Sequence, residues 1–171
     1  MKAIANVFLR AKHWQIFFLF FAAPTVAEFS AAGAGGLFYL SLDGVIFLCL
    51  LAWFGSMGFF LRSIVKPELR MGTRFLRFAL VYPVVYLPIF FFWLIPETAP
   101  AWVILPFHLA CMVCLIYLFY YASKNLALTE RRRQVSFYEY AGAFFLLWFY
   151  PVGVWVIQPK LNQLYAANIS A

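Results

Sequence analysis

The residues best suited to chemistry form one short cluster, His108-Leu109-Ala110-Cys111-Met112-Val113-Cys114. On a helix, His108, Cys111 and Cys114 share one broad face, and His108 and Cys111 are close enough to touch. A structural zinc site needs four ligands, and the neighbouring sequence offers no second pair. Redox Cys-x-x-Cys centres normally lie at solvent-accessible helix starts, where the thiolate is stabilised. These residues are therefore weak candidates for metal or redox chemistry, and we expect neither a metal nor a cofactor.

His108 by itself is the better candidate, because an ionisable residue inside a long apolar run is often functional. Glu28, Asp43 and Glu97 lie at the matching ends of other apolar runs. With His108 they could form a titratable patch of the kind that a proton or cation site uses. In the simpler interpretation the carboxylates contact water, and the imidazole bonds a tyrosine hydroxyl or a carbonyl freed by Pro106.

Catalytic motifs are not evident in the sequence. It contains no Gly-rich phosphate loop, no Ser/His/Asp arrangement and no zincin motif. The two histidines, His13 and His108, fall at opposite ends of their apolar runs, so they are not expected to ligate one haem iron. We therefore expect no catalytic residues and a protein that is not an enzyme.

The composition indicates that the surrounding solvent is a lipid bilayer. The 171 residues, taken as one domain (1–171), are 66% apolar, 22% aromatic and 11% charged, whereas soluble domains are roughly 25% charged. The net charge of +7 would suggest nucleic acid in a soluble protein. Here the basic residues flank apolar runs, where each contributes about 1 kcal/mol of attraction to anionic headgroups. We expect a bilayer as partner and no nucleic acid.

Five stretches are long and apolar enough to cross a membrane, which takes about 20 residues. The sequence therefore predicts an all-α, polytopic transmembrane helix bundle. Its spans are expected at about 14–32, 42–61, 78–95, 102–123 and 137–157.

The basic residues predict the orientation. Twelve of the thirteen Lys and Arg residues fall in three clusters, Lys2–Lys12, Arg62–Arg77 and Lys124–Arg133, and only Lys160 lies outside them. Because cytoplasmic loops retain Lys and Arg, all three clusters are expected in the cytoplasm. This gives a cytoplasmic N-terminus, five spans and a C-terminus outside.

The fifth span is open to an alternative. Pro151 and Gly153 interrupt it, and a helix that broke there and returned would leave four spans and a cytoplasmic tail. Against this, Ser136 and Glu139 have capping-box spacing just before the apolar run, which predicts a helix start. The 21 residues from 137 to 157 would rise about 31 Å, enough to cross.

The first basic loop predicts a surface helix. Pro67 suits the first position of a helix, and the basic residues that follow recur at helical spacing on one face. Those expected to contact lipid headgroups are Lys66, Arg70, Arg74 and Arg77. An orientation signal without a partner is the simpler interpretation of this loop and the one that the sequence favours.

Two tryptophans fall near the middle of their spans. The indole N–H groups of Trp53 and Trp148 would need a partner there. We expect them to mark a helix–helix or protein–protein surface.

Five segments, together about a third of the chain, carry a resemblance to known proteins: Ala11–Gln15, the fourth span with His108, Ala122–Lys124, Val135–Phe137 and Trp148–Asn162. They resemble a group of small, uncharacterised bacterial multi-pass inner-membrane proteins. The resemblance implies a bacterial inner-membrane location and a multi-pass topology, and it identifies no site residues. It also suggests that the segment Gln158–Asn162 is an ordered terminus.

The functional expectation is a non-catalytic accessory or interaction subunit of a membrane complex. The aromatic content and the small extramembrane mass favour lateral packing against other membrane chains or against a second copy. The alternative is a small proton- or cation-linked transporter that uses His108, Glu28, Asp43 and Glu97. A redox or metal-binding protein using His108, Cys111 and Cys114 is the third class.

Overall fold

The computed structural model describes residues 2–30, 36–90 and 100–169, and within these ranges the chain is helical with no strand. This agrees with the predicted all-α class. The elements in chain order are α1 (Lys2–Arg10), α2 (His13–Phe17), the π-helical η1 (Phe18–Ala22), α3 (Ala23–Ser30), α4 (Gly36–Ile64), the 3-10 turn η2 (Pro67–Leu69), α5 (Arg74–Ile89), α6 (Ala101–Arg131), α7 (Phe137–Trp148) and α8 (Tyr150–Ile169).

Two of the described helices are long and apolar enough to cross a membrane. They are the 23 residues Leu42–Ile64 of α4 and the 30 residues Trp102–Arg131 of α6. At 1.5 Å per residue these rise about 35 Å and about 45 Å, against a hydrocarbon core of about 30 Å. A shorter apolar helical stretch covers His13–Val26.

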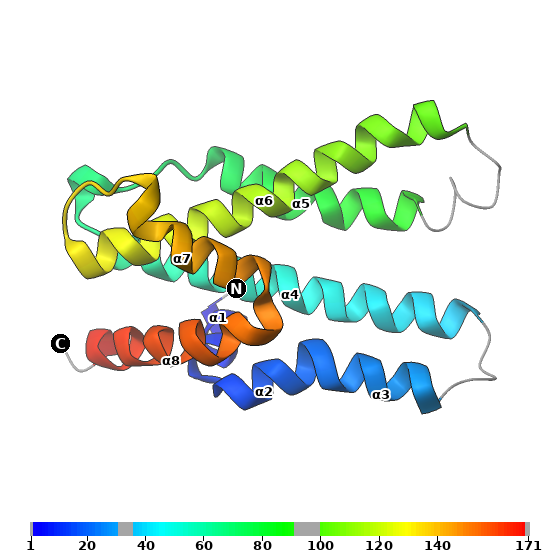
Figure 1. Ribbon diagram of the computed structural model, residues 1–171, viewed down its shortest axis with the longest axis horizontal. Coiled ribbons are helices and arrows are strands. Elements are labelled where there is room, and N and C mark those ends of the chain that lie inside the picture. The colour runs from blue at the N-terminus through cyan, green and yellow to red at the C-terminus, as the bar shows by residue number, and fades with distance from the viewer. Residues whose placement is uncertain (1, 31–35, 91–99, 170–171) are drawn as a thin grey trace.

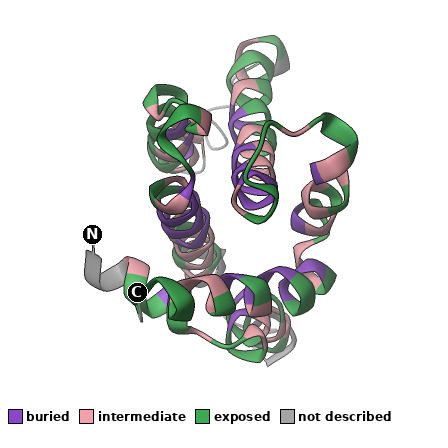
Figure 2. Cartoon of the chain, turned by 90° about the vertical axis from the view of Figure 1, so that its left-hand side faces the viewer, coloured by how far each residue is buried: buried purple, intermediate pink, exposed green. Residues whose placement is uncertain are grey.

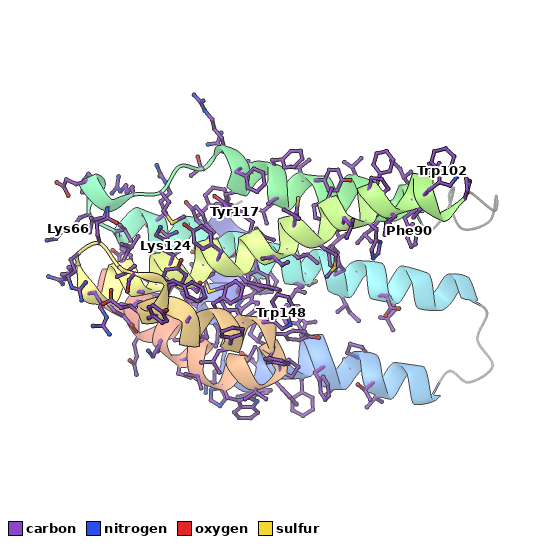
Figure 3. The ribbon with its side chains drawn as sticks, turned by 45° about the horizontal axis from the view of Figure 1, so that its top comes forward. Lys66, Phe90, Trp102, Tyr117, Lys124 and Trp148 are labelled. Carbon is purple, nitrogen blue, oxygen red and sulfur yellow. The ribbon has the colours of Figure 1, made fainter. Side chains whose placement is uncertain are left out.

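The long elements form two antiparallel pairs (Figure 1). The segment α2–η1–α3 runs beside α4, and α5 runs beside α6. The ends of α3 and α5 and the starts of α4 and α6 lie together at the right of Figure 1, here called the far end. The opposite end carries the 65–73 and 132–136 loops and is called the basic end, with Lys66 toward it in Figure 3. α1 lies across the long helices, nearer the basic end.

The predicted continuous helix over 137–157 is wrong, because the chain turns back at Phe149. That residue has φ −94° and ψ 57°, outside the helical region, and separates α7 from α8. The 12 residues of α7 rise about 18 Å, too short to cross. α8 then returns to the basic end, where Lys160 pairs with Glu130 of α6 at 2.9 Å. Lys160 therefore joins the other basic residues and is no longer an exception.

Two residues of the sequence explain the turn. Pro151 lies in the first turn of α8, where its missing N–H has no helical acceptor to lose. A Cβ on Gly153 would lie 1.7 Å from the carbonyl oxygen of Leu146, so only glycine lets α8 approach the α7 backbone this closely. The same two residues that cast doubt on the fifth span thus form the hairpin.

The predicted start of α7 is confirmed. Ser136 is its N-cap, and its backbone N–H donates to Oε2 of Glu139 at 2.8 Å, as a capping box requires. Oε1 of Glu139 also accepts from Nη2 of Arg133 at 2.6 Å. The end of α6 and the start of α7 are therefore held together at the basic end.

The predicted basic surface helix does not form. Only Pro67–Leu69 make a 3-10 turn, Arg70 is extended, and α5 begins at Arg74. The exposed Arg70 side chain folds back and donates to the carbonyl oxygens of Ser63 and Val65, both at 3.0 Å. These carbonyls at the end of α4 have no helical donor, so Arg70 caps that helix and breaks the expected spacing.

The core lies around α4. Trp53, Phe54, Met57 and Leu61 are almost completely buried. In Figure 2, seen from the basic end, the buried residues lie where the helices face one another. A Cβ on Gly58 of α4 would lie 3.4 Å from the Tyr121 ring of α6, so the small residue permits this close helix contact.

Candidate functional site

His108, the leading candidate of the sequence, lies on the exposed surface of α6. Its Nδ1 is 3.2 Å from the hydroxyl of Tyr86 on α5, and its ring centroid is 5.6 Å from that of Phe90. A tyrosine hydroxyl partner is what the simpler interpretation expected. Figure 3 shows Phe90 and Trp102 at the far end of this helix pair, which places the histidine well away from the basic end.

The sequence analysis missed an aromatic ladder on α5 that supports this contact. Phe78, Tyr82, Tyr86 and Phe90 follow one another at four-residue spacing, with adjacent ring centroids 5.5–5.9 Å apart. The Tyr82 hydroxyl donates to the Phe107 carbonyl of α6 at 3.0 Å. The four-residue spacing was visible in the sequence as a signal that these rings share one helix face.

Only part of the predicted acidic patch around His108 lies within the described residues. Asp43 lies on α4 with an exposed side chain, and no hydrogen bond or ion pair joins it to His108 in the described ranges. Glu28 belongs to α3, but its side chain lies outside the described residues, as does all of Glu97. The four-residue patch remains a prediction.

The weak metal and redox candidates differ in burial. Cys111 and Cys114 are both buried free thiols, whereas His108 is exposed and faces Tyr86. The part of the chain that the structure describes holds no group of three metal-ligating residues.

A largely buried polar group lies instead toward the basic end, between α1, α4 and α8. Oε1 of Gln158 accepts from the indole N–H of Trp53 at 2.9 Å, and both residues are fully buried. Nε2 of Gln158 donates to the carbonyl oxygens of Phe8 and Ala11, at 2.9 and 2.8 Å. Asn162, one turn further along α8, donates to the carbonyl oxygen of Leu9 at 2.7 Å. We call Trp53, Gln158 and Asn162 the polar anchor.

The polar anchor exists because α1 ends inside the protein. The last carbonyls of a helix have no intrahelical donor and need partners when buried. The extended Lys12 separates α1 from α2, and its backbone N–H donates to Oε1 of Gln15 at 2.8 Å. Residues four apart on α8 then present two amide side chains to the freed carbonyls on the same face. The Gln158–Asn162 segment is thus ordered helix.

The two tryptophans expected to mark interfaces have different surroundings. Trp53 is buried with its N–H bonded to Gln158, which confirms a helix–helix contact. Trp148 is 42% exposed, and its ring packs against Phe119 and Phe144 at 5.9 and 6.1 Å. In Figure 3 it lies midway between the two ends.

Glu139 at the basic end is the described carboxyl with the strongest electrostatic perturbation. The Ser136 backbone N–H, and then the Arg133 guanidinium, lower the pKa of Glu139 from 4.5 to about 2. Arg131 adds an ion pair at 3.5 Å. Every interaction around this carboxylate stabilises the loop between α6 and α7, so it acts as a structural cap.

Comparisons with family models, with curated proteins and with solved structures found no match to this chain.

Proposed function

We propose that the chain is a non-catalytic integral membrane subunit that packs the far half of α5 and α6 against another membrane chain or a second copy. We define the α5–α6 arm as residues 82–90 and 102–113. A bacterial inner membrane is the proposed location, with the basic end in the cytoplasm, because every Lys and Arg lies on elements or loops of that end.

His108 is the single observation that carries this proposal. Its side chain is exposed on the arm among large apolar neighbours, including Leu105, Leu109 and Met112. Tyr86 meets one ring nitrogen, and no donor or acceptor from the described residues meets Nε2. An imidazole facing hydrocarbon with an unsatisfied nitrogen is unfavourable, whereas a polar group on a packed partner would satisfy it.

The uneven burial of the two long helices supports the same conclusion. The most apolar window of α4 is 50% buried within the chain, and that of α6 only 17%. Trp102, at the start of α6, is 76% exposed. A helix that uses so little of its surface within its own chain has surface left for a partner.

We infer four membrane crossings with a half-depth α7–α8 hairpin on the cytoplasmic side, because α2–η1–α3 and α5 run beside the two long helices. Each long pair would cross and return, and the hairpin turn at Phe149 would lie within the hydrocarbon region. Such a turn is tolerated where protein surrounds it, and Gly153 and Leu147 near it are buried.

The test is site-specific photo-crosslinking in native membranes. A photoreactive amino acid at Leu109, beside His108, should give a discrete crosslinked protein band, either heterologous or dimeric. The matched control is Val152, which is similarly exposed (65% against 54%) but lies on the α7–α8 hairpin, and it should give none. Lipid adducts alone from Leu109, or equal bands from both positions, would overturn the proposal.

Transport is the second candidate function, favoured by the exposed Nε2 of His108, which meets no donor or acceptor among the described residues. If the chain moves protons or cations, His108→Ala should abolish flux into proteoliposomes that contain the purified chain. Flux that is present and unchanged by this substitution would exclude His108 as its site.

A further inference from the structure

An apolar groove lies where α1 meets α2, next to the polar anchor but separate from it. It has a volume of about 390 Å³ and is lined mainly by Val7, Phe8, Ile16 and Leu19, with Arg10 and Gln15. Phe8 and Ile16 are buried and belong to the protein core, whereas Val7 is 66% exposed and Leu19 is also exposed. The groove therefore has a fixed apolar floor and an apolar edge open to the surroundings.

The chain segment that forms this groove carries only positive charge. Lys2, Arg10 and Lys12 are the only charged residues before Glu28 in the sequence, and Arg10 lines the groove. Three other cations of the basic end are paired with acids: Arg131 and Arg133 with Glu139, and Lys160 with Glu130. The exposed Arg10 guanidinium makes no hydrogen bond or ion pair with any residue that the structure describes.

The orientation of α1 explains why these features coincide. α1 lies across the long helices near the basic end, as an amphipathic helix at a membrane surface would. Gln158 and Asn162 hold its last turn in place through the carbonyl oxygens of Phe8, Leu9 and Ala11. The groove is therefore preformed, and its residues would lose little conformational entropy when a ligand binds.

We infer that this groove binds an anionic phospholipid. One acyl chain lies against Val7, Ile16 and Leu19, and the phosphate of the headgroup accepts hydrogen bonds from the Arg10 guanidinium. Arginine suits this role because its planar fork matches phosphate geometry. A zwitterionic lipid fits the same apolar floor, but the positive ammonium of its headgroup cancels the negative phosphate, so Arg10 attracts it less strongly.

Binding is measured on the full purified chain in detergent by native mass spectrometry. The probes are phosphatidylglycerol and phosphatidylcholine with identical acyl chains. We expect tighter binding of phosphatidylglycerol, and about fivefold weaker binding after Arg10→Gln, the contribution of one basic residue near the surface. Val7→Asn should also weaken binding, because it places a polar group on the acyl edge without disturbing the core.

The matched control is Lys66→Gln, which removes an equally exposed cation from the same end but outside the groove. If Lys66→Gln weakens binding as much as Arg10→Gln, and Val7→Asn has no effect, the attraction is diffuse and the site is wrong. Equal binding of both lipids would also overturn it. Glycerol 3-phosphate, which has the phosphate without the acyl chains, should not compete; competition would show an anion site that is independent of the groove.

Discussion

Gln158 on α8 and His108 on α6 are both single polar side chains within apolar helices, but their surroundings differ. The amide of Gln158 is fully buried and bonded at both ends, to Trp53 and to the carbonyls of Phe8 in α1 and of Ala11 just beyond it. The imidazole of His108 is exposed, and its hydrogen-bonding partner is the Tyr86 hydroxyl on α5. The difference teaches that the polar anchor is satisfied within the chain, whereas the α5–α6 arm exposes a polar group to its surroundings.

This comparison separates stability from interaction. Removing a hydrogen-bonded polar group from the core leaves its partners unsatisfied, which lowers the free energy of unfolding. Deleting an exposed one mainly changes what the surface can bind. Substitutions in the basic half should therefore lower stability, and substitutions on the arm should lower association.

The largest effect is expected at Gly153. A Cβ there would overlap the Leu146 carbonyl oxygen, so Gly153→Ala must open the α7–α8 hairpin and should reduce stability by about 3 kcal/mol or more. Thermal unfolding in detergent measures the effect. Gly142→Ala on α7 is the control, since its Cβ would meet nothing within 4 Å. That variant should unfold at the same temperature or slightly higher, because alanine favours helix by about 1 kcal/mol. Equal behaviour of the two variants would contradict the hairpin.

Gln158→Met should follow, with a loss of about 2–3 kcal/mol. The side chain keeps its length, but the Trp53 indole N–H and the Phe8 carbonyl lose their partner, and the Ala11 carbonyl keeps only its bond to Asn162. Chemical unfolding followed by tryptophan fluorescence reports both stability and the surroundings of Trp53. Gln163→Met, at an exposed position of the same helix, should have little effect. If both variants are equally stable, the polar anchor does not hold α1.

His108→Ala should change the stability of the isolated chain by less than about 1 kcal/mol. It removes one hydrogen bond to Tyr86 at an exposed position. The same substitution should reduce the crosslinking yield from Leu109 in membranes. A stability loss as large as that of Gln158→Met would remove the distinction between the two halves.

The smallest effect is expected for Glu139→Gln, and it depends on pH. The folded-state pKa of Glu139, about 2, lies below its ordinary 4.5. Its stabilising contribution is therefore complete above about pH 4.5 and is lost as the pH falls toward 2. The difference in melting temperature between the wild type and Glu139→Gln should be constant above pH 5 and should shrink below it. Glu68→Gln is the control, because Glu68 lies on the exposed 3-10 turn and takes part in none of the ion pairs found among the described residues.

Much of the secondary structure follows from local sequence. The apolar runs around 42–61 and 102–123 become α4 and α6, and the capping box starts α7 at Phe137. These predictions succeed because run length and N-cap chemistry act within a few residues. The basic surface helix failed because Arg70 finds better acceptors at the end of α4, a tertiary contact that its helical spacing does not show.

The candidate sites were less accessible to prediction. The residue type of His108 and its place in an apolar run predicted it as a candidate site, and a tyrosine hydroxyl was among its expected partners. Gln158 was seen only as part of a terminal segment, because its partners Trp53 and Phe8 are 105 and 150 residues away in the chain. The groove beside Arg10 depends on the angle between α1 and α2, which no periodicity encodes.

The sequence by itself determined the helical class, the apolar character and the collection of basic residues near one end. These properties follow from composition and from the short range of helical hydrogen bonding. Only the tertiary structure decided that the fifth apolar run folds back. A run long enough to cross can still turn where Gly153 lets two backbones touch, and the returning helix then satisfies the buried carbonyls of α1. Those gains come from contacts between distant segments, which local spacing does not reveal.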